Sequence, residues 1–309
     1  MHKLFWIALP LANLVACEKN SNNSQPIVPT YDDALLQKVR VAATAVPGQL
    51  PASINYVKYA ATVSKWKDIL EGGNDDTSSL ARTTFQIVYA DGYIMVDAGM
   101  DRAVHHFFEN EGPQPFDDTL ASKVAAAVQH AKLILVTHEH GDHVAGVVRT
   151  TNNTIPAKTI LTEEQVYSLV NNPQMPEIKL AEERSKQYLV TSFESVLPVA
   201  PGVVLIKAPG HAKGEIMIYT RLQNGKEYIF TGDVSWTYKG IAENILKPKG
   251  RRAAIGENDE YVSKQVAWLQ QRLKKDGMVM LISHDAVMLP QYAAQGLINN
   301  RLEYPILHR

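Results

Sequence analysis

Cysteine is nearly absent from this chain of 309 residues, which contains only Cys17. A single thiol cannot form a disulfide within the chain, and it cannot build the cysteine clusters that hold structural zinc. Any metal ion must therefore be bound by nitrogen and oxygen atoms.

An excess of charge of one sign is also lacking, because 31 basic residues face 32 acidic ones, for a net charge of −1. This balance gives no global attraction to nucleic acid, and we expect no nucleic-acid partner. The basic run Lys247, Lys249, Arg251 and Arg252 is interpreted as a solvated loop rather than as a contact for phosphate or lipid headgroups.

Long apolar runs are missing as well, since a transmembrane helix needs about 20 apolar residues. The apolar stretch at residues 4–16 follows Lys3 and is interrupted by proline and asparagine. Its pattern is typical of a secretory signal; a buried N-terminal helix with a chance cysteine is the alternative. The run Leu14-Val15-Ala16-Cys17 also resembles the bacterial lipobox, in which cleavage precedes the cysteine and the new N-terminus receives lipid.

This resemblance divides the chain into three parts. Residues 1–16 are expected to be a lipoprotein signal peptide, and residues 17–30 a lipidated Cys17 with a flexible tether. Residues 31–309 show no internal repeat and no second linker, so they are expected to form one domain. Glu18 follows the cysteine, and by resemblance to enterobacterial sorting rules this favours a lipid anchor in the outer membrane, facing the periplasm.

What is present is the composition of a globular protein, with 45% hydrophobic and 20% charged residues. Apolar runs flanking Asp91-Gly92 and Asn224-Gly225 predict two hairpins. The predicted strands are residues 83–90, 93–97, 133–136, 215–222, 226–232 and 278–283. The predicted helices are residues 118–132, 162–170, 259–275 and 291–302.

Histidines and aspartates stand where these apolar strands end. The densest group, Thr137-His138-Glu139-His140-Gly141-Asp142-His143, directly follows residues 133–136. His211, Asp233 and His284 each follow or precede a further strand. Buried imidazoles and carboxylates need partners, and this ligand set suits zinc, manganese, iron or cobalt. A polar surface loop that happens to be rich in histidine is the alternative for the first group.

This pattern resembles the metallo-β-lactamase superfamily, whose HxHxDH motif is specific. The resemblance implies an α/β fold: an αββα sandwich of two mixed sheets packed face to face with helices outside. It implies two divalent transition-metal ions, with zinc the leading candidate. The first would be held by His138, His140 and His211, the second by Asp142, His143 and His284, with Asp233 bridging both. Asp97 matches the family's early structural aspartate and is expected to support the ligands from behind.

Two metals would make hydroxide available at neutral pH for attack on a carbonyl carbon. The chain is therefore expected to be a metal-dependent hydrolase acting on a small molecule, with Asp142 and Asp233 as catalytic residues and Asp142 as the proton shuttle. The intervals from His143 to His211, to Asp233 and to His284 are 68, 22 and 51 residues. These intervals resemble those of the N-acyl-homoserine lactonases and favour a lactone or small carboxylic ester as substrate.

The substrate contacts depart from that group. Such lactonases often carry a tyrosine three residues after the bridging aspartate, and here Trp236 stands there, with Tyr238 two residues further on. Both are candidate substrate-binding residues. The alternatives are a β-lactamase or a glyoxalase II-like thioesterase of the same fold, a mononuclear iron dioxygenase, and a non-catalytic metal-binding lipoprotein.

Overall fold

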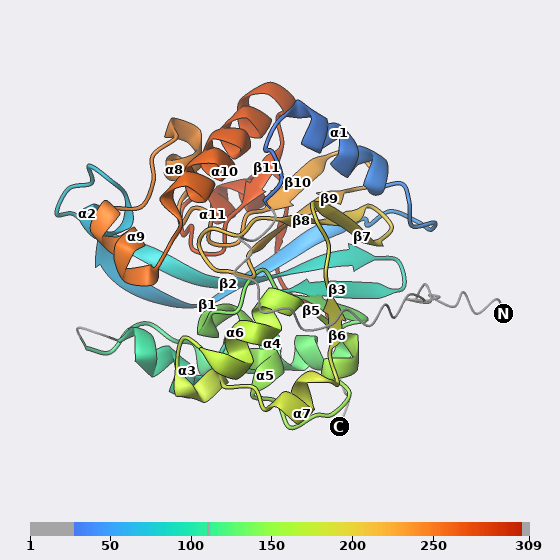
Figure 1. Ribbon diagram of the computed structural model, residues 1–309, viewed down its shortest axis with the longest axis horizontal. Helices are drawn as coiled ribbons and strands as arrows, with labels where there is room; N and C mark the ends of the chain where they lie inside the picture. Colours follow the sequence, from blue (N-terminus) through green and yellow to red (C-terminus); the bar gives the residue numbers. More distant parts are fainter. Residues whose placement is uncertain (1–27, 110–111, 305–309) are drawn as a thin grey trace, which may run out of the picture.

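Two β-sheets pack face to face, and helices cover both outer faces (Figure 1). The computed structural model describes residues 28–109 and 112–304, so the predicted signal peptide and Cys17 lie outside it. No helix in these ranges is long and apolar enough to cross a bilayer. The arrangement is the αββα sandwich that the sequence motif implied.

The first sheet has seven strands in the order β12-β1-β2-β3-β4-β5-β6. A long antiparallel pair, β1 and β2, joins the β2–β3 hairpin, while β4, β5 and β6 run parallel to β3. The strands are β1 (Ser53–Lys65), β2 (Thr77–Tyr89), β3 (Gly92–Val96), β4 (Leu133–Leu135), β5 (Thr159–Thr162), β6 (Leu189–Thr191) and β12 (Asn299–Asn300).

The second sheet has five strands in the order β11-β10-β9-β8-β7. Its pairs are antiparallel except β10 with β11, which run parallel. The strands are β7 (Val196–Ala200), β8 (Val203–Lys207), β9 (Ile216–Arg221), β10 (Glu227–Phe230) and β11 (Val279–Leu281). Because β4, β10 and β11 end on the same side of the sandwich, the residues that follow them can meet there.

Helices cover each sheet from outside (Figure 1). Those over the first sheet are α3 (Arg102–His105), α4 (Asp118–His130), α5 (Gly141–Val148), α6 (Glu163–Asn171) and α7 (Glu182–Ser185). Those beside the second sheet include α1 (Asp33–Ala42), α8 (Tyr238–Glu243) and α10 (Asp259–Gln271). Helix α11 (Met288–Ala294) instead contacts β12 and buries Leu289 and Tyr292 in the layer between the sheets. Two short helices, α2 (Trp66–Ile69) and α9 (Lys249–Ile255), lie at one end of the sandwich.

The core has three apolar layers, one between the sheets and one under each set of helices. In the central layer, the rings of Phe85 and Phe230 meet edge to face across the two sheets, with centroids 5.2 Å apart. Val262, Val266 and Leu269 of α10 are buried against the second sheet, as their spacing predicted. Burying one such side chain stabilises the fold by about 1.5–3 kcal/mol.

One predicted helix is wrong over most of its length, from residue 295 onward. The helix predicted over residues 291–302 is α11, which ends at Ala294. Gly296 follows with a φ of 70°, and the chain then enters β12. A left-handed glycine stops a helix, and that signal outweighs the helical spacing beyond it.

Candidate metal centre

The seven predicted ligands come together at one edge of the sandwich. His138 follows β4, His140 stands at the N-cap position of α5, and Asp142 and His143 lie in the first turn of that helix. His211 lies in the turn between β8 and β9, while Asp233 and His284 follow β10 and β11. Each ligand therefore lies on a short connection after a buried strand or, for Asp142 and His143, in the first turn of the helix that follows it.

A glycine makes the approach to Asp233 possible. Gly232 has a φ of 53°, in the left-handed region, and a Cβ at this position would lie 1.9 Å from Oε1 of Glu215. Any side chain would collide with this carboxylate, which accepts a hydrogen bond from the Asp233 amide at 2.8 Å. The Thr231-Gly232-Asp233 turn is thus shaped by its buried neighbour.

The ligand atoms form two clusters. The first cluster is His138, His140 and His211, and the second cluster is Asp142, His143 and His284; within each, the ligand atoms lie within 4.8 Å of one another. In the first cluster, Nε2 of His211 is 3.0 Å from Nδ1 of His140. In the second, Oδ2 of Asp142 is 3.4 Å from Nε2 of both His143 and His284.

Asp233 stands between the clusters. Its Oδ2 lies 3.4 Å from Nε2 of His211 in the first cluster and 3.0 Å from Nε2 of His284 in the second. Its Oδ1 lies 3.4 Å from Nε2 of His143. A carboxylate in this position can bridge two cations.

The outer hydrogen bonds of the histidines fit metal binding. Nδ1 of His143 donates to Asp97 at 2.8 Å, and Nδ1 of His211 donates to Glu257 at 2.5 Å. Nδ1 of His284 lies 2.6 Å from the carbonyl oxygen of Ala81 and 2.8 Å from Nη1 of Arg82. A proton on Nδ1 leaves a lone pair on Nε2, the atom that faces the cluster, and metal-binding histidines use this arrangement.

Several inward-facing atoms lack a partner within the described chain. Nε2 of His138, Nε2 of His143 and Oδ1 of Asp233 are buried and make no hydrogen bond. Leaving a buried polar atom without a hydrogen-bond partner costs free energy. A cation bound by these imidazole nitrogens and carboxylate oxygens would be a suitable partner for them. The donor set of imidazole nitrogen and carboxylate oxygen suits divalent zinc, manganese, iron or cobalt.

Burial and neighbouring charges lower the pKa of two histidines in the first cluster, whereas neighbouring charges raise the pKa of one in the second. Burial, together with His211, lowers the pKa of His140 to about 3, and burial with His143 lowers the pKa of His138. Burial opposes a charge on His143 too, but Asp142 and Asp97 raise its pKa well above the usual range. Without a metal, His143 therefore favours its protonated form, and a bound cation would displace that proton.

The carboxylates of the site are held ionised. Burial alone would raise the pKa of Asp142, but His143 and Arg82 hold it well below its usual range. His284 and His143 do the same for Asp233 against the effect of burial. Both side chains are thus available as anionic ligands at neutral pH.

Asp97 lies where the motif placed it. Its Oδ1 accepts from the Thr137 amide at 2.8 Å, and its Oδ2 faces His143. Asp97 has a φ of 60°, and its backbone amide is hydrogen-bonded to the Leu135 carbonyl. It therefore ties the end of β3 to the loop that carries the first ligands.

Three buried residues around the clusters carry no signal in the sequence. Glu215 lies with Oε2 3.4 Å from Nδ1 of His138, and burial beside Asp233 raises its pKa well above the usual range. Glu257 contacts His211 from a loop 46 residues away. Arg82 of β2 places Nη1 2.8 Å from Nδ1 of His284 and Nε 3.3 Å from Oδ2 of Asp142. These residues are close to the ligands in the folded chain, but their spacing in the sequence does not reveal it.

The predicted solvated basic loop is wrong in two respects: its last three basic residues lie in helix α9, and two of the four are buried. Lys247 is 3% exposed, and its ammonium group donates to the Asp233 carbonyl at 2.6 Å and lies 2.9 Å from Glu257. Arg252 is also buried, and it pairs with Asp259. Both cations are drawn inward because buried carboxylates and carbonyls offer them partners.

Trp236 and Tyr238 differ in their relation to the centre. Nε1 of Trp236 donates to Oδ2 of Asp233 at 2.8 Å, and the ring centroid lies 6.2 Å from that of His284. Tyr238 instead begins α8: its amide donates to Asp285, and its ring lies 6.5 Å from that of Tyr292. Of the two predicted substrate contacts, Trp236 is the one that adjoins the clusters.

Comparisons with known proteins agree with this geometry. Residues 81–284 match the model of the metallo-beta-lactamase superfamily. No curated protein sequence matches the chain.

Solved structures share the fold at low sequence identity. An N-acyl homoserine lactone hydrolase with N-hexanoyl-L-homoserine at its catalytic metal centre is 15% identical, with a TM-score of 0.62 over 83% of this chain and 100% of the other. A dizinc quorum-quenching lactonase is 15% identical, with a TM-score of 0.54 over 75% and 87%. A probable metal-dependent hydrolase from Staphylococcus aureus is 15% identical, with a TM-score of 0.57 over 77% and 91%.

Proposed function

The chain belongs to the metallo-beta-lactamase superfamily, and from this premise we propose that it is a dinuclear metal-dependent hydrolase of lactones or small carboxylic esters. The observation that carries the proposal is the position of Asp233, with one carboxylate between two complete clusters of ligand atoms. The likeness in fold to lactone hydrolases supports the substrate class.

Two divalent cations, zinc being the leading candidate, would act as Lewis acids and lower the pKa of a water molecule to about 7, so that a nucleophile is available at neutral pH. The first cluster would hold one cation and the second cluster the other, with Asp233 shared between them. No serine or cysteine nucleophile is needed in this scheme.

The chain's own residues supply the remaining steps. Asp142 lies beside both histidines of its cluster and is the group that would carry a proton to the leaving alkoxide. Trp236 fixes Asp233 through its indole N–H and presents an aromatic wall next to His211 and His284. Lys247 donates to the Asp233 carbonyl and Glu215 accepts from the Asp233 amide, so both hold the backbone at this ligand.

Export and lipid anchoring belong to the same proposal. The lipobox-like run ending at Cys17, followed by a polar tether, supports a lipoprotein held in the cell envelope with its hydrolase domain facing the periplasm. Cys17→Ser should release the protein from membranes or leave its leader uncleaved. An unmodified Cys17 in the mature native protein, seen by mass spectrometry, would refute the anchor.

The substrate class is tested with zinc-loaded protein against matched lactone, β-lactam, thioester and phosphodiester substrates. We expect lactones and small esters to be cleaved fastest. Efficient cleavage of β-lactams without measurable lactonase or esterase activity, under the same metal loading, would overturn the assignment.

A further inference from the structure

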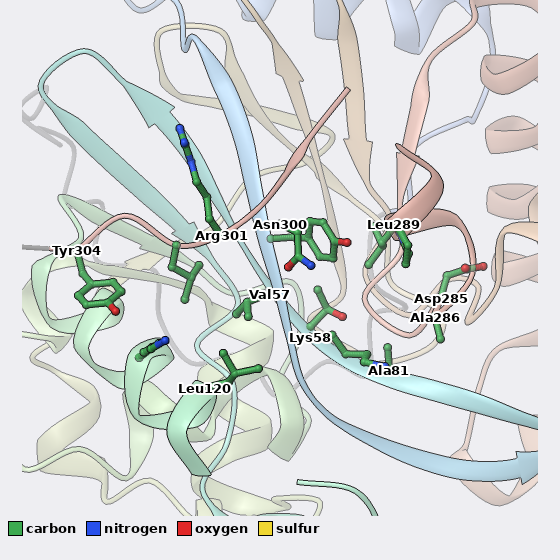
Figure 2. A pocket seen from close by; sticks show the side chains of 15 residues that line it. Val57, Lys58, Ala81, Leu120, Asp285, Ala286, Leu289, Asn300, Arg301 and Tyr304 are labelled. Carbon is green, nitrogen blue, oxygen red and sulfur yellow. The ribbon is translucent and has the colours of Figure 1, made fainter. Parts of the chain in front are cut away.

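A cleft separate from the metal clusters opens at the edge of the first sheet (Figure 2). Its volume is about 590 Å³, within the range of small-molecule pockets. None of the seven clustered residues lines it. Its walls come from β1, β2, α4, α11 and the chain that follows β12.

The cleft occupies a gap in the pairing of β1. β12 pairs with β1 at Asn55 and Tyr56. Residues 115–117 bond to the same strand from Tyr59 onward. Between these contacts, Val57 and Lys58 line the cleft (Figure 2).

One part of the wall is apolar. Leu120 of α4, Leu289 of α11 and Leu302 face the space together with Val57 and Pro290. Leucine and proline side chains can bury an acyl chain or a ring, at about 25 cal/mol for each Å² removed from water.

The polar part of the wall offers donors without acceptors. Tyr56 is 3% exposed and Thr83 5%, and the buried Thr83 hydroxyl makes no hydrogen bond with any residue that the structure describes. Burial raises the pKa of Tyr56, so its hydroxyl keeps its proton at neutral pH. Lys58 and Lys123 likewise contact no carboxylate within the described ranges. Protonated donors of this kind attract an anion.

The acid in the wall does not neutralise these donors. Oδ2 of Asp285 accepts from the Tyr238 amide, and its Oδ1 accepts from the amides of Val287 and Met288. Arg301 contacts only Glu303, at 3.4 Å, among the residues described. The lining thus carries three cations against one committed carboxylate.

We propose that this cleft binds a small amphipathic carboxylate, with its apolar body against Leu120, Leu289 and Leu302 and its anionic head between Lys58 and Lys123. The cleft shares a wall with the second cluster, because Ala81 lines the cleft and its carbonyl oxygen lies 2.6 Å from Nδ1 of His284. Binding in the cleft requires no contribution from the metals, so this proposal does not depend on the proposed hydrolase function.

Lysine footprinting tests the location. Metal-loaded protein is acetylated with a lysine-reactive ester, alone and with octanoate, octyl phosphate, 1-octanol or acetate, and each site is quantified by mass spectrometry. Octanoate should slow the modification of Lys58 and Lys123 at least about threefold, by direct burial of their ammonium groups. Exposed Lys226 and Lys264 should react at unchanged rates.

The controls separate the possible ligands. Acetate and 1-octanol should protect poorly, because each lacks either the apolar body or the charge. Octanoate that binds the protein yet leaves Lys58 and Lys123 unprotected, as it would if it only coordinated the metals, would overturn the proposal. Protection by octyl phosphate at lower concentration than octanoate would overturn the carboxylate assignment.

Charge variants test the same site without chemical modification. Lys58→Gln combined with Lys123→Gln should weaken octanoate binding about tenfold in calorimetry. The matched pair Lys226→Gln and Lys264→Gln, which changes the net charge equally, should not. An equal loss in both pairs would show a non-specific charge effect and contradict the proposal.

Discussion

The two halves of the metal centre have different surroundings. The histidines of the first cluster are backed by acids, with Glu257 on His211 and Glu215 beside His138. The second cluster contains the carboxylate of Asp142, but a buried guanidinium, Arg82, lies against both Asp142 and His284. In the sequence pattern each half has three ligands, and Asp233 belongs to both. The difference in surroundings therefore arises from residues outside that pattern.

This difference predicts unequal metal affinity. A carboxylate on the outer nitrogen of a histidine strengthens it as a ligand, and each cluster has one, Glu257 on His211 and Asp97 on His143. The guanidinium of Arg82, by contrast, lies only beside the second cluster. A cation beside a metal repels the metal, and it also competes for the same anion. We therefore expect the first cluster to hold its metal more tightly than the second.

Removing a ligand of the first cluster should have the largest effect. His211→Ala deletes the nitrogen that approaches both His140 and Asp233. We expect kcat/KM to fall about 1,000-fold or more, equal to about 4 kcal/mol. Metal content and steady-state rates are measured together, and a variant with full metal content and unchanged rate would remove His211 from the site.

Glu257→Gln should weaken the first cluster without deleting a ligand. The substitution removes the negative charge that Nδ1 of His211 contacts at 2.5 Å. Metal affinity should fall about 10- to 100-fold, as it does when other groups that hydrogen-bond to a metal ligand are removed. Glu163→Gln, on an exposed helix start, is the control. Equal affinities in both variants would show that Glu257 only fills space.

Arg82→Met should strengthen metal binding in the second cluster. Loss of the guanidinium frees Asp142 from a competing cation, and we expect about tenfold tighter binding of the second metal, or about 1.4 kcal/mol. Arg82→Lys keeps the charge and is the matched control. Stepwise titration of metal-free protein gives both constants, and a weaker second site in the methionine variant would contradict the account.

Acidification should empty the second cluster first. The raised pKa of His143 means that a proton competes with the metal there as the pH falls. His138 and His140 have lowered pKa values, about 3 for His140, so they stay neutral and able to bind at mildly acid pH. Cobalt-substituted protein would show this by absorbance, and loss of the first-cluster signal before the second would reverse the order.

Trp236 should have the smallest effect on the chemistry. Trp236→Ala should raise KM more than it lowers kcat, because an apolar wall contributes about 1.5–3 kcal/mol of uniform binding. Trp236→Phe keeps a ring but removes the N–H that donates to Asp233. A clear fall in kcat in the phenylalanine variant, which keeps the aromatic ring, would show that the hydrogen bond to Asp233 matters more than the apolar wall.

The sequence predicts that the candidate ligands lie close together because each follows an apolar strand, and strand ends on one side of a sandwich can meet. The αββα architecture followed from the same motif. It does not predict Arg82, Glu215 or Glu257, since isolated charged residues are common and only the folded chain brings them to the site.

Burial explains the remaining differences. Lys247 stands in a basic run typical of a solvated loop, yet buried oxygen atoms on Asp233 and Glu257 draw it inward. The N-terminal elements α1 and β1 and strands β5 to β8 carry no turn signal as clear as Asp91-Gly92, and their positions depend on packing partners far along the chain. The Cys17 lipid anchor remains a prediction, because it lies outside the described residues.

The metal content of the purified protein tests the central claim most directly. Elemental analysis of protein prepared without chelator should give nearly two transition-metal ions per chain. Asp233→Ala, which removes the carboxylate shared by the clusters, should lower both that number and the rate of hydrolysis. A reproducible value of one ion in the wild type, with metal affinity and rate unchanged in Asp233→Ala, would contradict a dinuclear centre bridged by Asp233.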